Sequence, residues 1–347
     1  MKKTYLNGFH AANGGNLVDF SGWEMPINYG SQINEHNEVR SNVGIFDVSH
    51  MAVFDFTGDN QAEFLRELLP NDVNKILGSA KALYSPLLNE EGGILDDLIV
   101  YHLGNNNFRI ISNCATREQN NSWFTEAANK YNVGVDFKEN ASIIAIQGPE
   151  SNKVLSSLYS FDLQNFHIYQ ENEVMIARTG YTGELGFEII SNEAKGLEIW
   201  NHLIDQGVQP IGLAARDTLR LEAGLNLYGS DMNIENHPYE SNLAWTIDNS
   251  DASRSYIGKQ GLLGKQATKK ELIGFYTEER GVLRAGSRIF FEGGEGIVTS
   301  GTYSPTFRKN IGLCRVDTNY PAQGSALLRD KEINLQFCET NFLKHLK

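Results

Sequence analysis

A double glycine followed by a strand that carries two adjacent aspartates is the feature that most constrains this chain. Residues 92–103 read GGILDDLIVYHL. The glycines predict a tight turn, and the apolar run behind them predicts a β-strand. Because side chains alternate along a strand, Asp97 and Tyr101 share one face while Asp96 lies on the other. Only one of the two carboxylates can therefore face a site beside Tyr101.

The pair of aspartates has two interpretations. Aspartate is common at turns, so both residues can serve simply to close the hairpin. Aspartate is also depleted inside strands, which favours a functional role for one of them. The rest of the chain has to decide between these two interpretations.

Hairpins and covering helices surround this strand. The pattern upstream predicts a helix that Asp59 caps and Pro70 ends. The full prediction for this part of the chain is a helix at 116–131 and strands at 52–57, 82–88, 108–112 and 133–137. This order is typical of an α+β unit rather than of a doubly wound sheet.

A second α+β set and a run of short strands follow. The second set comprises strands at 143–147, 174–178 and 185–190 and helices at 193–205 and 213–223. From about Glu271 the strands become short and recur every ten or so residues, which suggests a small β-barrel. A length of 347 residues fits two or three domains.

The charge of the chain limits its partners. With 43 acidic and 30 basic residues the net charge is −13, which argues against a nucleic-acid partner because such a protein needs a basic footprint. No apolar run approaches the roughly 20 residues of a membrane span, and residues 1–7 are not followed by the apolar core of a signal peptide. We therefore expect a cytoplasmic protein without a membrane partner. Three widely spaced cysteines exclude a disulfide framework and a four-cysteine metal site.

Three familiar patterns do not qualify as cofactor sites. The glycines of residues 180–186 precede a strand, whereas a dinucleotide loop follows a strand and opens a helix. Residues 261–266 lack the spacing and the hydroxyl of a phosphate loop. The eight histidines include no pair at metal-binding spacing. We expect neither a nucleotide nor a metal.

Polar side chains on regular elements are better candidates. Glu188 lies within a strand, where the plain alternative is an outward-facing residue. Arg216 and Arg220 lie one turn apart on a helix, where the plain alternative is a solvated charged face. A carboxylate on a rigid strand suits a ligand edge with two parallel N–H donors, and the edge of a 2-amino-4-oxopteridine is such a ligand.

Seven ordered motifs carry a resemblance to a known family. They are DFSGWEMP at 19–26, FDVSHM at 46–51, GGILDDLIVY at 92–101, QGP at 147–149, TGYTGE at 179–184, ARDTLRLEAG at 215–224 and TSGTYSPT at 299–306. In these motifs the chain resembles the aminomethyltransferases (T-proteins) of the glycine cleavage system. One departure is the C-terminus, which lacks the family's apolar-Phe-Val-Arg segment, so we expect no ligand contact from a terminal arginine.

The resemblance implies a three-domain α+β fold, a cloverleaf around a central folate site. Two lobes are α+β and ferredoxin-like, and the C-terminal lobe is a small β-barrel. The family's first domain is discontinuous, which fits the inserted character of the unit that starts near residue 51. We therefore expect one domain from 1–50 plus 141–270, an inserted domain at 51–140 and a barrel at 271–347.

The same resemblance implies roles for individual residues. The family's catalytic aspartate falls on Asp97, which leaves Asp96 to hold the turn or to support its neighbour. The glutamate that anchors the pterin falls on Glu188. The implied companions in the pocket are Tyr84, Tyr101, Asn113, Tyr181 and Arg220. Arg220 can hold a polar edge of the ligand or Glu188 itself, and the sequence leaves both possibilities open.

The implied function is tetrahydrofolate-dependent one-carbon transfer in glycine catabolism. The aminomethyl group on the lipoyl arm of H-protein passes to tetrahydrofolate, with release of ammonia and formation of 5,10-methylenetetrahydrofolate. Tetrahydrofolate is then a co-substrate, no flavin is expected, and the partners are H-protein and other components of the glycine cleavage system. Arg284, Arg308 and Lys309 are candidate docking groups for H-protein, with scattered surface charge as the alternative.

Three other functions fit parts of the pattern. A folate-binding assembly or repair factor of the same fold would perform no transfer, but such relatives carry a cysteine near residues 256–260, where this chain has none. The folate domain of a flavin-linked dimethylglycine or sarcosine dehydrogenase would need a separate flavin subunit. A structural protein without a ligand leaves Asp97 and Glu188 unexplained.

Overall fold

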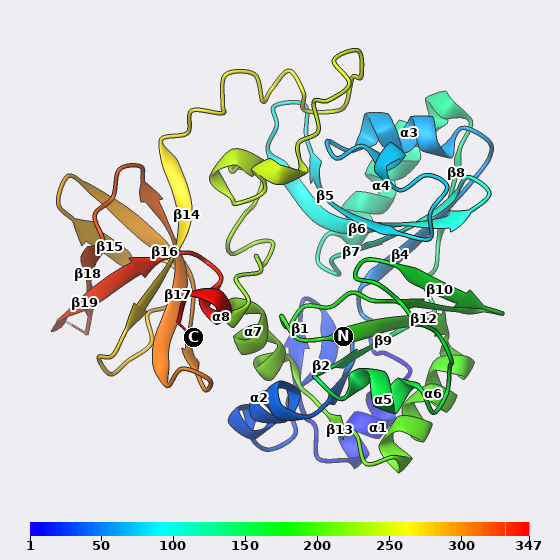
Figure 1. Cartoon of the computed structure of the whole chain (residues 1–347), viewed down its shortest axis with the longest axis horizontal. Coiled ribbons are helices and arrows are strands. Elements are labelled where there is room, and N and C mark those ends of the chain that lie inside the picture. The colour runs from blue at the N-terminus through cyan, green and yellow to red at the C-terminus, as the bar shows by residue number, and fades with distance from the viewer. Residues whose placement is uncertain (330, 347) are drawn as a thin grey trace.

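The computed structural model of the chain describes residues 1–329 and 331–346. Figure 1 shows three bodies, with two α+β units one above the other and a barrel beside them. Helix α7 (Leu213–Glu222) lies between the barrel and the lower α+β unit. The expected α+β fold with a C-terminal β-barrel is confirmed.

The first α+β unit is built on a six-stranded sheet in the order β10-β11-β12-β9-β3-β13. Its strands are β3 (Gly44–Asp47), β9 (Ala141–Gln147), β10 (Ile168–Glu171), β11 (Val174–Ala177), β12 (Gly186–Asn192) and β13 (Gln209–Pro210). The helices of this unit are α1 (Asn7–Ala12), α2 (Gln32–Ser41), α5 (Ser151–Leu155), α6 (Glu193–Asp205) and α7. Trp200 of α6 packs with Phe187 and Ile189 of β12, so α6 covers one face of the sheet. Glu188 lies between these two residues and therefore belongs to the opposite face.

The inserted unit is built on a five-stranded antiparallel sheet in the order β5-β6-β7-β4-β8. Its strands are β4 (Ala52–Thr57), β5 (Ala82–Leu88), β6 (Ile94–Gly104), β7 (Asn107–Ser112) and β8 (Gly134–Phe137), and its helices are α3 (Gln61–Leu68) and α4 (Arg117–Ala128). Phe64 of α3 and Phe124 of α4 pack with Leu98 and Val100 of β6. The two helices thus cover the face of β6 to which Asp96 belongs.

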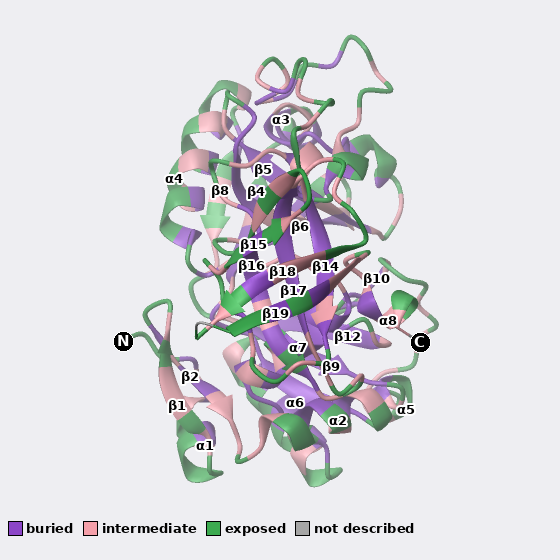
Figure 2. Ribbon diagram, turned by 90° about the vertical axis from the view of Figure 1, so that its left-hand side faces the viewer, coloured by how far each residue is buried: buried purple, intermediate pink, exposed green. Residues whose placement is uncertain are grey.

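The uncovered faces of the two sheets meet in a shared core. Tyr101 and Ile111 from the inserted unit join Ile143 and Ile190 from the first unit in one apolar cluster. Figure 2 shows the buried residues concentrated in strands such as β6, β9 and β12 and the exposed residues on the outer sides of helices such as α4 and α6. The Tyr101 face of β6 and the Ile190 face of β12 are therefore turned toward each other.

The C-terminal strands close into a six-stranded barrel in the order β14-β17-β16-β15-β18-β19. These strands are β14 (Lys270–Thr277), β15 (Arg288–Phe291), β16 (Gly294–Ser304), β17 (Lys309–Asp317), β18 (Gln323–Leu328) and β19 (Lys331–Cys338), and α8 (Phe342–His345) follows them. The recurrence of short strands from about Glu271 predicted this barrel. We keep the domain boundaries at 50/51, 140/141 and 270/271 as a proposal, in which the first two separate strands of different sheets and the third falls one residue inside β14.

One hairpin was missed by the sequence analysis, and one local expectation was wrong. Residues 16–28 form a hairpin of β1 (Asn16–Phe20) and β2 (Trp23–Asn28) that the sequence reading did not predict. Ser21 and Gly22 both have positive φ, at 51° and 84°, which is the two-residue turn that joins such strands. Helix α3 begins after Asn60 without a side-chain cap, so Asp59 is not the cap that was expected.

Candidate active site

The double glycine makes the turn that precedes β6. Gly92 has a φ of 79°, and a Cβ atom at Gly93 would lie 2.2 Å from the carbonyl oxygen of Ile234. Asn89 closes the turn, because its main-chain oxygen accepts from the N–H of Gly92 at 3.0 Å and its side-chain oxygen accepts from that of Gly93 at 2.7 Å. The aspartates make none of these hydrogen bonds. Turn formation therefore does not account for them.

Asp96 points into the inserted unit, where it is fully buried. Its Oδ2 atom accepts from Thr116 Oγ1 and from Asn120 Nδ2, both at 2.6 Å. Its Oδ1 atom accepts from Asn113 Nδ2 at 2.7 Å. An ionised carboxylate is an acceptor at every lone pair, so these donors satisfy a charge that burial would otherwise penalise.

Asp97 points the other way and is half-buried. Tyr84 of β5 donates its hydroxyl hydrogen to Oδ2 at 3.0 Å, and Asn113 Nδ2 donates to Oδ1 at 2.9 Å. Burial and the neighbouring charge of Asp96 raise the pKa of Asp97 to about 7. A carboxyl group that titrates near neutral pH can both take and give a proton under ordinary conditions.

Glu188 is buried on the inner face of β12. Thr179 Oγ1 donates to its Oε2 atom at 2.5 Å, and within residues 1–329 and 331–346 no other hydrogen bond reaches this carboxylate. The hydroxyl of Tyr101 is buried near it without a hydrogen-bond partner in the same part of the chain. Burial, followed by the charge of Glu188, raises the pKa of Tyr101. Two polar groups that lack full hydrogen bonding thus lie together between the sheets.

Arg216 of α7 is the cation that faces Glu188. Its guanidinium carbon lies 4.7 Å from the centre of the Tyr181 ring, a cation–π distance. Its Nη1 atom is buried and has no partner among the described residues. Burial lowers the pKa of Arg216, and the charge of Glu188 opposes that shift. The sequence placed Arg216 on the same helix face as Arg220 but did not single it out.

Arg220 has a different environment. Its Nε atom donates to Asp217 at 2.8 Å, its Nη1 atom to Asp231 at 2.7 Å and its Nη2 atom to Ser300 of β16 at 2.9 Å. These bonds tie α7 to the barrel, and Glu188 is not among the partners. Of the two roles that the sequence left open, a bond from Arg220 to Glu188 is not found among the described residues, and a contact of Arg220 with the ligand stays a prediction.

Aromatic side chains border Asp97. The ring of Tyr84 stacks on Trp245, with centroids 5.8 Å apart and planes at 20°. Trp245 is 65% exposed, so this pair reaches from the carboxylate to the surface. Tyr181 donates its hydroxyl hydrogen to the main-chain oxygen of Asn226. No sequence pattern singles out Trp245, because it lies in a segment with short 3-10 turns rather than in a regular element.

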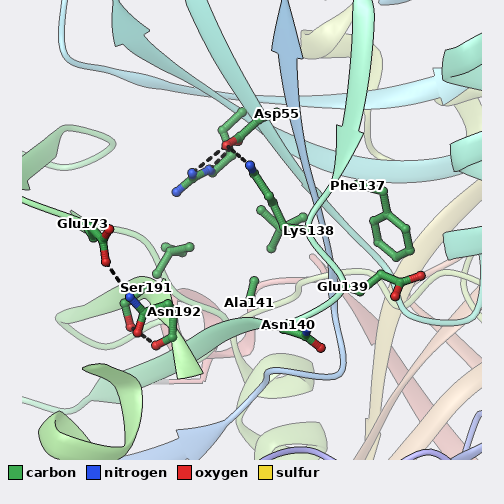
Figure 3. A pocket seen from close by; sticks show the side chains of 12 residues that line it. Asp55, Phe137, Lys138, Glu139, Asn140, Ala141, Glu173, Ser191 and Asn192 are labelled. Atoms are coloured by element: carbon green, nitrogen blue, oxygen red, sulfur yellow. Dashed lines mark hydrogen bonds and ion pairs between the residues drawn. The ribbon is translucent and has the colours of Figure 1, made fainter. Parts of the chain in front are cut away.

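A separate cavity of about 680 Å³ lies between the two α+β units, lined by residues of β4, β9 and β12 among others. Figure 3 shows its charged side chains, which include Asp55 and Lys138. Arg109 donates to Asp55 at 2.7 and 2.9 Å, and Lys138 lies 3.7 Å from the same carboxylate. Because both cations are paired with Asp55 and no predicted site residue lines the cavity, we do not assign the chemistry to it.

Among residues 1–329 and 331–346, no three or more His, Cys, Asp or Glu side chains form a group that could hold a metal ion. Each helix in this part of the chain is too short or too polar to cross a membrane.

Comparisons with known proteins agree with this architecture. The model of the GCVT N-terminal domain matches residues 6–251, and that of the glycine cleavage T-protein C-terminal barrel domain matches residues 270–344. An aminomethyltransferase of Xylella fastidiosa (strain M23) is 44% identical, covering 99% of this chain and 97% of that protein. An aminomethyltransferase of Xanthomonas axonopodis pv. citri (strain 306) is 45% identical, covering 99% and 96%.

A solved structure extends the similarity to three dimensions. The crystal structure of glycine cleavage system aminomethyltransferase T from Bartonella henselae matches with a TM-score of 0.93 and 31% sequence identity over 98% of both chains. Sequence and structure thus agree over nearly the whole length. The chain belongs to the aminomethyltransferase (T-protein) family of the glycine cleavage system.

Proposed function

We propose that this transferase takes the aminomethyl group from the lipoyl arm of H-protein and passes its carbon to tetrahydrofolate. The products are ammonia, 5,10-methylenetetrahydrofolate and the dihydrolipoyl arm. One observation carries the proposal: a carboxyl group with a pKa of about 7, Asp97, lies on a strand face turned toward an incompletely hydrogen-bonded carboxylate, Glu188.

Glu188 is proposed to anchor the pterin ring. Within the described part of the chain only its Oε2 atom accepts a hydrogen bond, from Thr179, so the carboxylate has lone pairs for the two N–H donors on the edge of the ring. Charge-assisted hydrogen bonds of this kind contribute about 1.5–3 kcal/mol each. Arg216 places a positive charge on the same side of the site as Glu188. Tyr101 and Tyr181 are proposed to flank the flat ligand, because aromatic rings pack well against such a surface.

Asp97 is proposed to manage protons during the transfer. In the balanced reaction two bonds form from the carbon to the N5 and N10 atoms of the folate, while its bonds to the amine nitrogen and to the lipoyl sulfur break. The two N–H hydrogens of the folate end on ammonia and on the lipoyl thiol. A group that takes up and releases a proton near pH 7 is suited to these proton transfers. Holding carrier and folate side by side supplies the rest of the acceleration.

The direct test is a reaction with aminomethyl-loaded lipoyl carrier and tetrahydrofolate. We expect ammonia and methylenetetrahydrofolate to appear together and in equal amounts. A carrier without the aminomethyl group and a reaction without folate are the controls. Tight folate binding without either product would favour the alternative of a folate-binding assembly or repair factor.

A further inference from the structure

Asp96 is a buried charged group for which the proposed reaction has no use. Three side chains donate to it at 2.6 to 2.7 Å, from Asn113, Thr116 and Asn120. Thr116 precedes α4 at the position where a hydroxyl often caps a helix, yet it makes no capping hydrogen bond. Its hydroxyl hydrogen is donated to Asp96, and its oxygen accepts from Asn120 Nδ2 at 3.2 Å. Burial raises the pKa of Asp96, and the hydrogen bonds from these three donors oppose that rise and favour the ionised carboxylate.

Asn113 connects the two carboxylates. Its Nδ2 atom lies 2.7 Å from Oδ1 of Asp96 and 2.9 Å from Oδ1 of Asp97. The two N–H bonds of one amide group therefore serve both acids, which brings the two groups close together in a poorly solvated place. Two like charges at such a distance cannot both be ionised without a large penalty. The side chain with fewer donors, Asp97, is the one that takes up a proton.

We propose that Asp96 is a positioning residue whose negative charge, held by Thr116 and Asn120, keeps a proton available on Asp97. The role of that proton rests on the proposed function, whereas the coupling of the two carboxyl groups can be measured without it. Asp96 itself touches neither substrate, because it lies on the opposite face of β6.

Four other titratable groups around the pair are neutral at neutral pH. Tyr84 faces Asp97 from β5, Tyr181 from the loop before β12, and Tyr228 from the segment after α7. Cys114 faces Asp96 from the end of β7. Burial raises the pKa of each of these four groups. Asp96 is thus the charge to which Asp97 responds.

The experiment follows the titration of Asp97 directly. Aspartate labelled with ¹³C at the carboxyl carbon is incorporated into the full chain without ligand, and Asp97→Asn identifies the signal. In Asp96→Asn we expect the midpoint of Asp97 to fall by at least about one pH unit, because the neighbouring charge is gone. An unchanged midpoint in a folded Asp96→Asn variant overturns the proposal.

A second pair of variants covers the case in which Asp96→Asn does not fold. Thr116→Val removes one donor to Asp96 and should also lower the midpoint of Asp97, whereas Thr116→Ser should restore the wild-type value. Thr125→Val on the exposed side of α4 is the matched control. If Thr116→Val leaves the midpoint where it is in the wild type, the proposal is wrong.

The loaded-carrier reaction separates this inference from the proposed function. The limb of the kcat profile that reports Asp97 should move to lower pH in Asp96→Asn by the same amount as the NMR midpoint. If the wild type does not turn over but the NMR midpoint of Asp97 shifts in Asp96→Asn, the coupling of the two carboxyl groups is supported and the proposed reaction is wrong. If the wild type turns over and neither readout shifts, the role of Asp96 fails alone.

Discussion

Arg216 and Arg220 lie one turn apart on α7, yet their guanidinium groups have opposite environments. Arg220 is buried between Asp231 at 2.7 Å and Ser300 at 2.9 Å, and a third bond reaches Asp217. Nη1 of Arg216 has no partner in the described part of the chain, and its charge faces Glu188. The same helix therefore presents one arginine to the barrel and another to the site.

Replacing each arginine by alanine should separate binding from stability. Arg216→Ala should weaken tetrahydrofolate binding about tenfold or more with little change in melting temperature, because it removes a charge beside Glu188. Arg220→Ala should lower the melting temperature strongly, since breaking a buried ion pair costs about 3–5 kcal/mol. Calorimetric titration and thermal unfolding check the two outcomes. Arg216→Ala with unchanged affinity would remove this residue from the site.

Asp97→Asn should fold and bind tetrahydrofolate but lose most of its turnover. The expected loss is about 10²–10⁴-fold, the usual contribution of a general acid–base group. Asp96→Asn should lose less, because Asp96 acts only through its neighbour. Steady-state rates with loaded carrier give the comparison. Equal losses in the two variants would contradict the assignment of the faces of β6.

The pKa of Asp97 also predicts how stability depends on pH. Its folded pKa of about 7 lies above the ordinary value of 3.8. Between these two values the folded chain holds a proton that the unfolded chain releases, so this group makes the folded state less stable as pH rises from about 4 to 7. Above pH 7 the penalty is constant.

Asp97→Asn removes this penalty. We expect its melting temperature to exceed that of the wild type by roughly 10 °C at pH 8, because a rise in pKa from 3.8 to about 7 costs about 4 kcal/mol and each kcal/mol shifts the melting temperature of a large domain by about 2–4 °C. The difference should vanish near pH 4. Asp205→Asn, at the exposed end of α6, is the control and should show no such trend. A gain that is equal at pH 4 and pH 8 would rule out titration of Asp97 as its cause.

Glu188→Ala should weaken tetrahydrofolate binding by at least about tenfold, because two charge-assisted hydrogen bonds are lost. The exposed Trp245, stacked on Tyr84, offers a fluorescence signal for the titration. Trp245→Phe should abolish that signal, which tests the readout independently. Glu198→Ala on the outer side of α6 is the matched control for charge. Unchanged affinity in Glu188→Ala would refute the anchoring role.

Reversing the charge of exposed barrel residues should affect only the interaction with H-protein. Arg284 and Arg308 are exposed, whereas Lys309 pairs with Glu278 at 3.0 Å. Arg284→Glu combined with Arg308→Glu should raise the KM for the carrier several-fold at low salt and leave the KM for folate unchanged, since rim charges mainly steer encounter. Lys153→Glu on α5 is the control. Unchanged carrier kinetics in the double variant would mean that H-protein docks elsewhere.

Much of the fold could be read from local patterns. Strand β4 at 52–57, strand β5 at 82–88 and helix α6 at 193–205 have the predicted bounds. In each of these segments the spacing of apolar residues depends only on the local sequence, and the folded chain forms the element that this spacing predicts. The β1–β2 hairpin was missed because its turn, Ser21–Gly22, is not one of the common hairpin pairs.

The sequence by itself determined which faces the critical residues occupy. Alternation along β6 separated Asp96 from Asp97, and the ordered motifs identified the family, because both depend only on the order of residues. Tertiary structure alone decided what meets those faces. Asn113 reaches both aspartates from the end of β7, Trp245 stacks on Tyr84 from a distant segment, and Arg216 rather than Arg220 faces Glu188. Such contacts join residues far apart in the chain, and no local pattern specifies them.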